Sequence, residues 1–183
     1  KVAIGGDGAD EFQAGYDPFR AWGFGRLLDR VTGGQSSRFI RMFERLTPVS
    51  DENMSLRFKL AHFGRGMDHP TNERTQGWMA GFSKSMMLEV LHPDVVKEFE
   101  LEEVLEPSRI AFESARHLGV LHAQINTWIH TYMECCILTK VDRASMMHSL
   151  EVRAPFLDVD LASLMFALKA KDIYSRGRGK VAL

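Results

Sequence analysis

The chain has 183 residues, of which 45% are hydrophobic and 26% are charged, so it is long enough to build a globular domain around a hydrophobic core. Its 23 lysines and arginines nearly balance its 24 aspartates and glutamates, which leaves a formal net charge of −1. That balance argues against a protein that coats nucleic acid or binds a membrane through a polybasic surface. No apolar run approaches the roughly 18–20 residues of a membrane-spanning helix.

The two cysteines, Cys135 and Cys136, are adjacent in the sequence. Neighbouring cysteines rarely form a disulfide and lack the spacing of a metal knuckle, so we predict free thiols and a reducing, cytoplasmic setting. The seven histidines are scattered and include no HxxxH or HExxH pair, so no zinc site is predicted.

The sequence begins at Lys1 inside an apolar strand pattern, residues 2–4, and it stops at Leu183 just as another apolar pattern starts. We therefore expect a piece of a longer protein. Because a single strand is not stable alone, we expect at most one short strand here, with its sheet partners outside the chain.

Beyond a glycine-rich turn, almost all of the sequence has the apolar spacing of amphipathic helices. The helices that we predict span residues 17–31, 36–47, 56–67, 84–91, 107–119 and 121–133, with short helices within 71–82 and after Pro93 and a last helix from Asp158. The candidate N-caps are Asp17, Ser36 or Ser37, Ser83 and Asp158. The predicted fold class is therefore mostly α, in one domain or part of one.

A first constellation of chemically active residues occupies residues 5–11, with the sequence GGDGADE. Glycines after a strand allow φ > 0 and a close approach of the backbone to a ligand. Asp7, Asp10 and Glu11 would repel a bare phosphate but suit a phosphate that is carried with Mg²⁺. The pattern is equally compatible with an ordinary strand-to-helix turn, and it is neither a Walker A loop nor a Rossmann GxGxxG.

A second constellation covers residues 140–146 and 151–158, where basic and acidic residues alternate with apolar ones. Charges mixed so closely with apolar residues predict partial burial and pairing. One interpretation is a salt-bridged helix on the first loop, with Asp158 as a cap. For Lys140 and Arg143 we favour a role facing an anion.

The two constellations together resemble the asparagine synthase family. Residues 4–16, IGGDGADEFQAGY, are similar to the family's SGDGADE…GGY loop, with Gly5 in place of Ser and Gln13-Ala14 in place of Phe-Gly. Residues 140–158 are similar, nearly residue for residue, to its KvDRaSMahsLEvRvPFLD signature. Residues 17–130 match it only in general character.

This resemblance implies a fold and a place in a longer protein. The chain would be the helical part of an α/β synthetase domain, similar to the adenine-nucleotide alpha-hydrolases (ATP pyrophosphatases), with most of the parallel sheet missing. Residues 1–183 would form its central and C-terminal part, without the glutaminase domain or the SGGxDS-type ATP loop. The family's catalytic lysine would lie beyond Leu183, after the segment that starts at Gly179-Lys180.

The resemblance also implies a reaction. Members of the family adenylate a carboxylate, typically aspartate, with Mg²⁺ and ATP, and ammonia from glutamine then displaces AMP. The implied partners are aspartate, ATP and ammonia, with no nucleic acid or membrane and with a homodimer as an open alternative.

By position, Asp10 resembles the Mg²⁺ ligand of the family. Asp7 would contact the substrate or the amine, and Arg143 would lie near the pyrophosphate. The nucleotide-binding residues that the resemblance implies are Gly5, Gly6, Gly8 and Lys140.

Two alternatives stay open at this point. The same fold could act on another carboxylate, as relatives that form β-lactams, cyclise peptides or amidate sugars do. The chain could also be a non-catalytic helical interaction module, in which the 10 methionines and 12 phenylalanines form a packing face.

Overall fold

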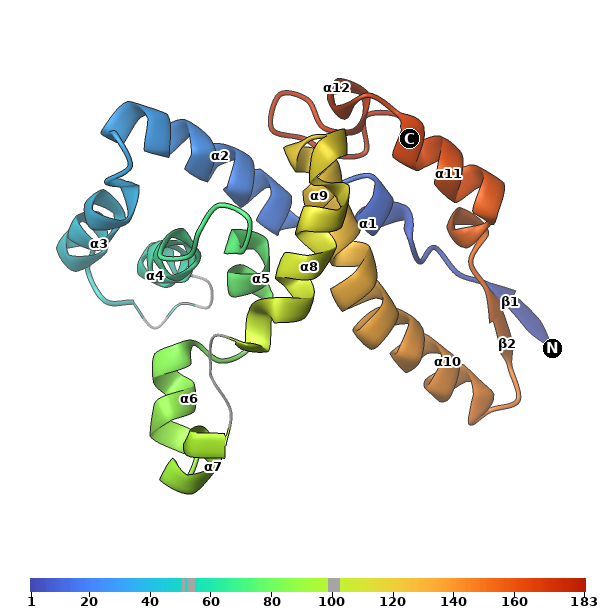
Figure 1. Cartoon of the computed structure of the whole chain (residues 1–183), viewed down its shortest axis with the longest axis horizontal. Coiled ribbons are helices and arrows are strands. Elements are labelled where there is room, and N and C mark those ends of the chain that lie inside the picture. Colours follow the sequence, from blue (N-terminus) through green and yellow to red (C-terminus); the bar gives the residue numbers. More distant parts are fainter. Residues whose placement is uncertain (51, 53–54, 99–102) are drawn as a thin grey trace. The chain divides into compact units, whose positions relative to one another are not determined.

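The computed structural model describes residues 1–50, 52, 55–98 and 103–183, and it is mostly helical (Figure 1). The chain divides into two compact units, and each is described by itself. The first unit combines Lys1–Phe19 with Pro107–Leu183, and the second is Arg20–Glu106. Among the described residues, no helix has both the length and the apolar character that crossing a membrane requires.

The first unit contains the strand pair and the C-terminal helices. Its elements are β1 (Val2–Ile4), α1 (Ala9–Phe12), α8 (Glu106–Ala115), the 3₁₀ turn η2 (Arg116–Leu118), α9 (Val120–Trp128), the π-helix η3 (Ile129–Leu138), α10 (Thr139–Met146), β2 (Glu151–Arg153), the 3₁₀ turn η4 (Pro155–Leu157), α11 (Val159–Ala167) and α12 (Ala170–Ile173).

Every regular element described in the second unit is a helix or a 3₁₀ turn. Its elements are α2 (Asp17–Thr32, whose first turn belongs to the first unit), α3 (Ser36–Leu46), α4 (Leu56–Met67), α5 (Arg74–Met79), α6 (Lys84–Val90), α7 (Pro93–Glu98) and the 3₁₀ turn η1 (Glu103–Leu105). The sequence predicted α2, α3, α4 and α6 to within one residue at each end, and it predicted a short helix in the region of α5 and another from Pro93, without their full bounds.

Strands β1 and β2 form a two-stranded parallel sheet (Figure 1). The register pairs Val2 with Glu151, Ala3 with Val152 and Ile4 with Arg153. The prediction of at most one strand, with partners only outside the chain, was therefore wrong. Residues 151–153 alternate charged and apolar side chains over three positions only, which is too short a pattern to tell a strand from a charged turn.

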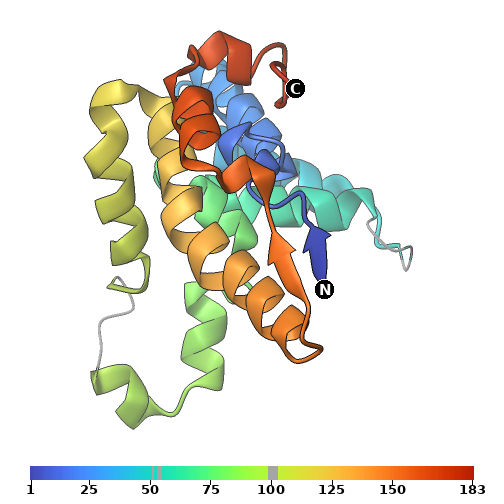
Figure 2. The ribbon, with the colours of Figure 1, turned by 90° about the vertical axis from the view of Figure 1, so that its right-hand side faces the viewer.

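Helix α9, the π-helix η3 and helix α10 follow one another without a break from Val120 to Met146. Figure 2 shows this long helical run beside the strand pair, and α10 packs against β2. The predicted helix over 121–133 is thus confirmed but continues further than expected. Trp128, the last residue of α9, is 1% exposed and stacks on the Tyr16 ring at a centroid distance of 4.9 Å.

Local capping decided where several helices begin. Ser83 accepts a hydrogen bond from the Met86 amide, and Asp158 accepts from two amides of the first turn of α11, so both predicted caps are confirmed. The predicted cap on α3 was wrong. Ser36 lies inside that helix, and its hydroxyl donates a hydrogen bond to the Asp29 carboxylate instead.

An ion pair between a buried arginine and a partly exposed aspartate lies in the second unit. The Arg74 guanidinium lies 2.6 Å from Asp29 Oδ2, and the Arg74 side chain is 8% exposed. Burial raises the pKa of Asp29, but the hydrogen bonds from Ser36 and Arg74 and the Arg74 charge outweigh it and hold the pKa below its usual value of 3.8. The ionised carboxylate is therefore the form that the fold stabilises.

We predict that Asp29→Asn lowers the free energy of unfolding by about 1–3 kcal/mol at neutral pH, because Arg74 is left without its charged partner. The pKa of Asp29 is depressed on folding, so this stabilisation is present above pH 3.8 and is lost as the pH falls through the lower folded value. The free energies of unfolding of the two proteins, measured with urea, should then converge once the pH falls below the lowered pKa of Asp29. Asp94→Asn is the matched control, because that carboxylate is 70% exposed and should change little.

Candidate functional site

The strand pair brings the two sequence constellations together. The Gly5 amide donates to the Arg153 carbonyl at 2.8 Å, and the Glu151 amide donates to the Lys1 carbonyl at 3.0 Å. Since β1 and β2 are parallel, the loops that follow them leave from the same edge of the sheet. A Cβ atom on Gly8 would lie 2.6 Å from a methyl carbon of Leu157, so the two loops are in contact.

The glycines of the first loop have different roles. Gly8, the N-cap of α1, has φ = 95°, a conformation that favours glycine. Neither Gly5 nor Gly6 has a positive φ, so the expectation that three glycines supply left-handed backbone holds for Gly8 alone. The Gly5 amide is committed to the sheet, whereas Gly6 is exposed and has open space around its Cα. Gly6 is thus the position where the loop backbone is most open to a ligand.

Asp10 is paired with a lysine that the sequence analysis did not select. Lys180 Nζ lies 2.8 Å from Asp10 Oδ1, with the two side chains 43% and 36% exposed. The backbone fixes this pair, because the Lys180 amide donates to the Gln13 carbonyl at 2.7 Å. A Cβ on Gly179 would lie only 2.0 Å from the Ala14 carbonyl oxygen, so that approach requires glycine. The alternation of glycine and basic residues at 177–180 was the available signal.

Asp7 lies on a pocket of about 210 Å³ that the second constellation also lines. The polar lining comes from Asp7, Asp142, Ser145 and Glu151, and the apolar lining from Leu138, Val141, Met146, Val152, Ala154 and Leu157. Three carboxylates around one small pocket create a negative potential that attracts cations and amines. The structure thus joins Asp7 to Asp142, a pair that the sequence did not connect.

Lys140 and Arg143 lie elsewhere on α10. Both are exposed and neither lines the Asp7 pocket. The expected partial burial of this charged segment was wrong, since Asp142, Glu151 and Arg153 are exposed too. These charged side chains project outward from α10 and from β2. The ion pair found among them joins Arg153 Nε to Glu151 Oε1 at 2.8 Å.

A buried carboxylate anchors the first motif to the helical core. Glu11 is 1% exposed and accepts a hydrogen bond of 2.7 Å from the Tyr16 hydroxyl. Burial, followed by the hydrogen bond and the charge of Glu11, raises the pKa of Tyr16 far above its usual value. Tyr16 therefore stays protonated, donates to Glu11 and stacks on Trp128. The end of the GGDGADE…GY motif is structural in this chain.

The residues fit Mg²⁺ that arrives with a nucleotide. Magnesium is usually held by one or two carboxylates together with waters and substrate phosphates, and Asp10 offers one half-exposed carboxylate. Asp10 Oδ1 is paired with the Lys180 ammonium, and Asp10 Oδ2 is the carboxylate oxygen for which no ion pair is found among the described residues. Across the described ranges, no group of three or more His, Cys, Asp and Glu side chains is arranged to hold a metal by itself.

The family model described as asparagine synthase matches residues 1–183, and the chain belongs to that family. It is 28% identical over 165 residues to asparagine synthetase 1 (glutamine-hydrolysing) of Bacillus subtilis (strain 168), which covers 86% of this chain and 23% of that protein. It is 30% identical over all 183 residues to proteins of Mycobacterium bovis and Mycobacterium tuberculosis provisionally named asparagine synthetase (glutamine-hydrolysing). The chain spans 26% of the length of each mycobacterial protein, so it corresponds to about a quarter of these relatives. No solved structure matches it.

We predict that Gly15→Ala disrupts the Asp10–Lys180 pair. The new Cβ would lie 2.0 Å from Asp10 Oδ1 and 2.6 Å from Lys180 Cε, so both side chains must move. Thermal unfolding should show a loss of about 1 kcal/mol, the scale of a partly exposed ion pair, because both side chains can swing away from the added methyl group. Gly6→Ala is the control, because nothing lies within 4 Å of its added Cβ. Equal stability of the two variants would mean that Gly15 is not needed for this contact.

Proposed function

We propose that this chain forms one side of the synthetase site of an ATP-dependent amidotransferase. In this proposal the site adenylates a carboxylate, aspartate, and ammonia released from glutamine displaces AMP to give asparagine. The observation that carries the proposal is the β1–β2 pairing, which joins the Asp7–Asp10 loop to the 140–158 signature. Family membership and the asparagine synthetase names of the relatives support it.

The charges around the loop suit the adenylation step. Attack of a carboxylate on the α-phosphate builds negative charge on the departing pyrophosphate, and fixed cations stabilise such charge. When bound, Mg²⁺ would neutralise phosphate oxygens, with Asp10 as its protein ligand. Lys180 is held against Asp10 by its own backbone hydrogen bond and is the basic group paired with that carboxylate. In our proposal its ammonium group contacts the phosphates of the nucleotide.

Asp7 suits the amine side of the reaction. Its pocket is lined by three carboxylates and no basic side chain, which favours the ammonium group of an amino-acid substrate or incoming ammonia over a phosphate. Lys140 and Arg143 lie outside this pocket, and in our proposal they meet the pyrophosphate and nucleotide from the exposed face of α10. Gly6 and Gly8 border the nucleotide, while Gly5 holds the loop on the sheet.

Other parts of a longer protein would complete the site. In this proposal residues 1–183 are the central and C-terminal part of an α/β synthetase domain of the adenine-nucleotide alpha-hydrolase type. The ATP loop and the glutaminase would come from outside them. Val2 is 58% exposed and Ile4 is 80% exposed, as expected of strand residues that further strands or helices cover. The free thiols of Cys135 and Cys136 support a cytoplasmic setting.

We predict that Asp10→Asn in the full-length protein lowers substrate-dependent pyrophosphate release by 100-fold or more, because the amide keeps the shape but loses the charge that Mg²⁺ requires. Asp142→Asn is the comparison: it lines the pocket but does not touch the loop cation, and it should cost tenfold or less. The assay varies Mg²⁺, with thermal melting as the folding control. Normal turnover and normal Mg²⁺ dependence in Asp10→Asn would show that Asp10 is not a Mg²⁺ ligand and has only a structural role.

The 183-residue chain alone should be catalytically silent, because a site divided between segments does not act in additive pieces. The assay offers the full-length protein aspartate and then a panel of other carboxylates. Pyrophosphate release with aspartate supports the proposal. Release only with another acid would mean that this acid, and not aspartate, is the substrate. Adenylation of aspartate by the isolated chain would contradict the requirement for the missing segments.

A further inference from the structure

The long helix of the first unit changes its winding before it reaches the site. It is α-helical over Val120–Trp128, π-helical over Ile129–Leu138 and α-helical again over Thr139–Met146. A π-helix of ten residues is unusual, since most are single-turn bulges, and such bulges are frequent at functional sites. The π-helix therefore needs a physical cause, and its position immediately before α10 gives it a consequence.

The cause lies partly in the apolar pattern. Ile125, Ile129, Met133, Ile137 and Val141 recur at every fourth residue, and the three that are buried are at most 9% exposed. Four residues make slightly more than one turn of an α-helix, which has 3.6 residues per turn, and slightly less than one turn of a π-helix, which has about 4.4. A row of side chains spaced by four therefore rotates slowly around the helix axis, in opposite directions in the two windings. Combining the two windings keeps this row of side chains on the core.

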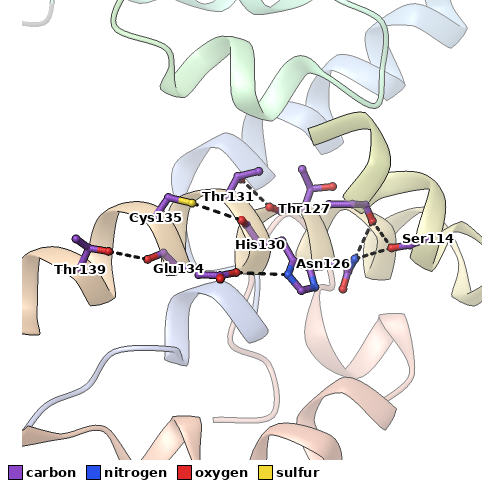
Figure 3. Close-up of polar contacts among 9 residues, drawn as sticks. Ser114, Asn126, Thr127, His130, Thr131, Glu134, Cys135 and Thr139 are labelled. Atoms are coloured by element: carbon purple, nitrogen blue, oxygen red, sulfur yellow. Dashed lines mark hydrogen bonds and ion pairs between the residues drawn. The ribbon is translucent and has the colours of Figure 1, made fainter. Parts of the chain in front are cut away.

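A second row of side chains, also spaced by four, changes its hydrogen-bond partners along the helix. Thr127 and Thr131 donate to the carbonyls four residues earlier, at 2.9 and 2.6 Å. Cys135 and Thr139 donate instead to the carbonyls five residues earlier, those of His130 at 3.8 Å and Glu134 at 3.1 Å. Figure 3 shows Thr131, Cys135 and Thr139 in succession along the helix, each with its bond to the preceding turn. The Thr139 hydroxyl thus bonds across the last turn of the π-helix, five residues back, as the π winding itself does.

The winding decides which face of α10 meets the Asp7 pocket. Each residue of a π-helix turns through a smaller angle than a residue of an α-helix, so over ten residues the difference reaches about half a turn. In the π winding, Val141, Asp142 and Ser145 line the pocket with Asp7. Lys140 and Arg143 lie on the opposite face of α10, where an α-helical segment would turn them toward the pocket instead.

We propose that Thr139 is a positioning residue, whose hydroxyl holds the π winding of residues 129–138 and so directs Asp142 and Ser145 toward Asp7. Its importance for turnover rests on the proposed function, whereas its effect on the helix does not. Thr139 is well placed for this role because it is the first residue after the π-helix and directly precedes Lys140. Its bond to Glu134 crosses the junction between the two windings.

The test compares three variants of the 183-residue chain. Thr139→Val keeps the shape but removes the donor, Thr139→Ser keeps the donor, and Thr131→Val removes the matched donor that bonds in the α-helical manner four residues back. Amide hydrogen exchange, followed residue by residue by NMR, reports how strongly the helical hydrogen bonds across the junction between the two windings are held. In Thr139→Val, the amides of residues 135–146 should exchange at least tenfold faster than in the parent. In Thr131→Val the same amides should exchange within threefold of the parent, and in Thr139→Ser they should keep the parent's protection.

The same variants are then assayed in the full-length protein. Thr139→Val should lower kcat/KM for substrate-dependent pyrophosphate release about tenfold, and Thr131→Val less than twofold. Equal exchange in Thr139→Val and Thr131→Val would overturn the positioning role of Thr139. If exchange changes as expected but the unmodified full-length protein releases no pyrophosphate with any carboxylate, the proposed function fails and the control of the winding stands.

Discussion

The candidate site depends on the parallel pairing of β1 with β2. Without that ladder, nothing local would bring the Asp7–Asp10 loop to the 140–158 segment, because they lie at least 130 positions apart in the sequence. Two strands of three residues are too short to be stable alone, so the helices must hold them. Helix α10 packs against β2, and α1 packs against α9, the π-helix and α11. The positions of the loop residues therefore depend on this helix packing.

Charge is the second constraint on the site. Asp7, Asp142 and Glu151 share one small pocket, and Asp10 lies in the first turn of α1, directly after the loop. Among the described residues, the cation found in contact with this loop is Lys180, which two close backbone approaches hold in place. So much negative charge destabilises itself unless cations approach it, which is why the arrangement suits Mg²⁺ and amines. The same reasoning gives Gly15 its importance, because any side chain there would push Asp10 and Lys180 apart.

The sequence predicted what is determined locally. The helices of the second unit, the caps at Ser83 and Asp158 and the turn at Gly8 depend on residues within a few positions, so their patterns could be read directly. The second strand, the π-helix and the Asp10–Lys180 pair depend on distant partners. Glu151–Arg153 forms a strand only because β1 lies beside it, and Lys180 joins the site only because its backbone reaches Gln13. The recognised family motif supplied the candidate residues but not which of them would be neighbours.

The most direct test of this account is a disulfide between the two strands. In a chain with Cys135 and Cys136 replaced by serine, Ala3→Cys and Val152→Cys should cross-link readily on mild oxidation. Paired strands lie about 4.8 Å apart, within the Cα separation that a disulfide spans. Ala3→Cys with Ala154→Cys is the control, since two residues out of register adds about 6.6 Å along the strand. We predict that only the first pair forms the disulfide, as measured by mass spectrometry of the digested protein. A cross-link in the second pair alone, or in neither, would contradict the pairing on which the site depends.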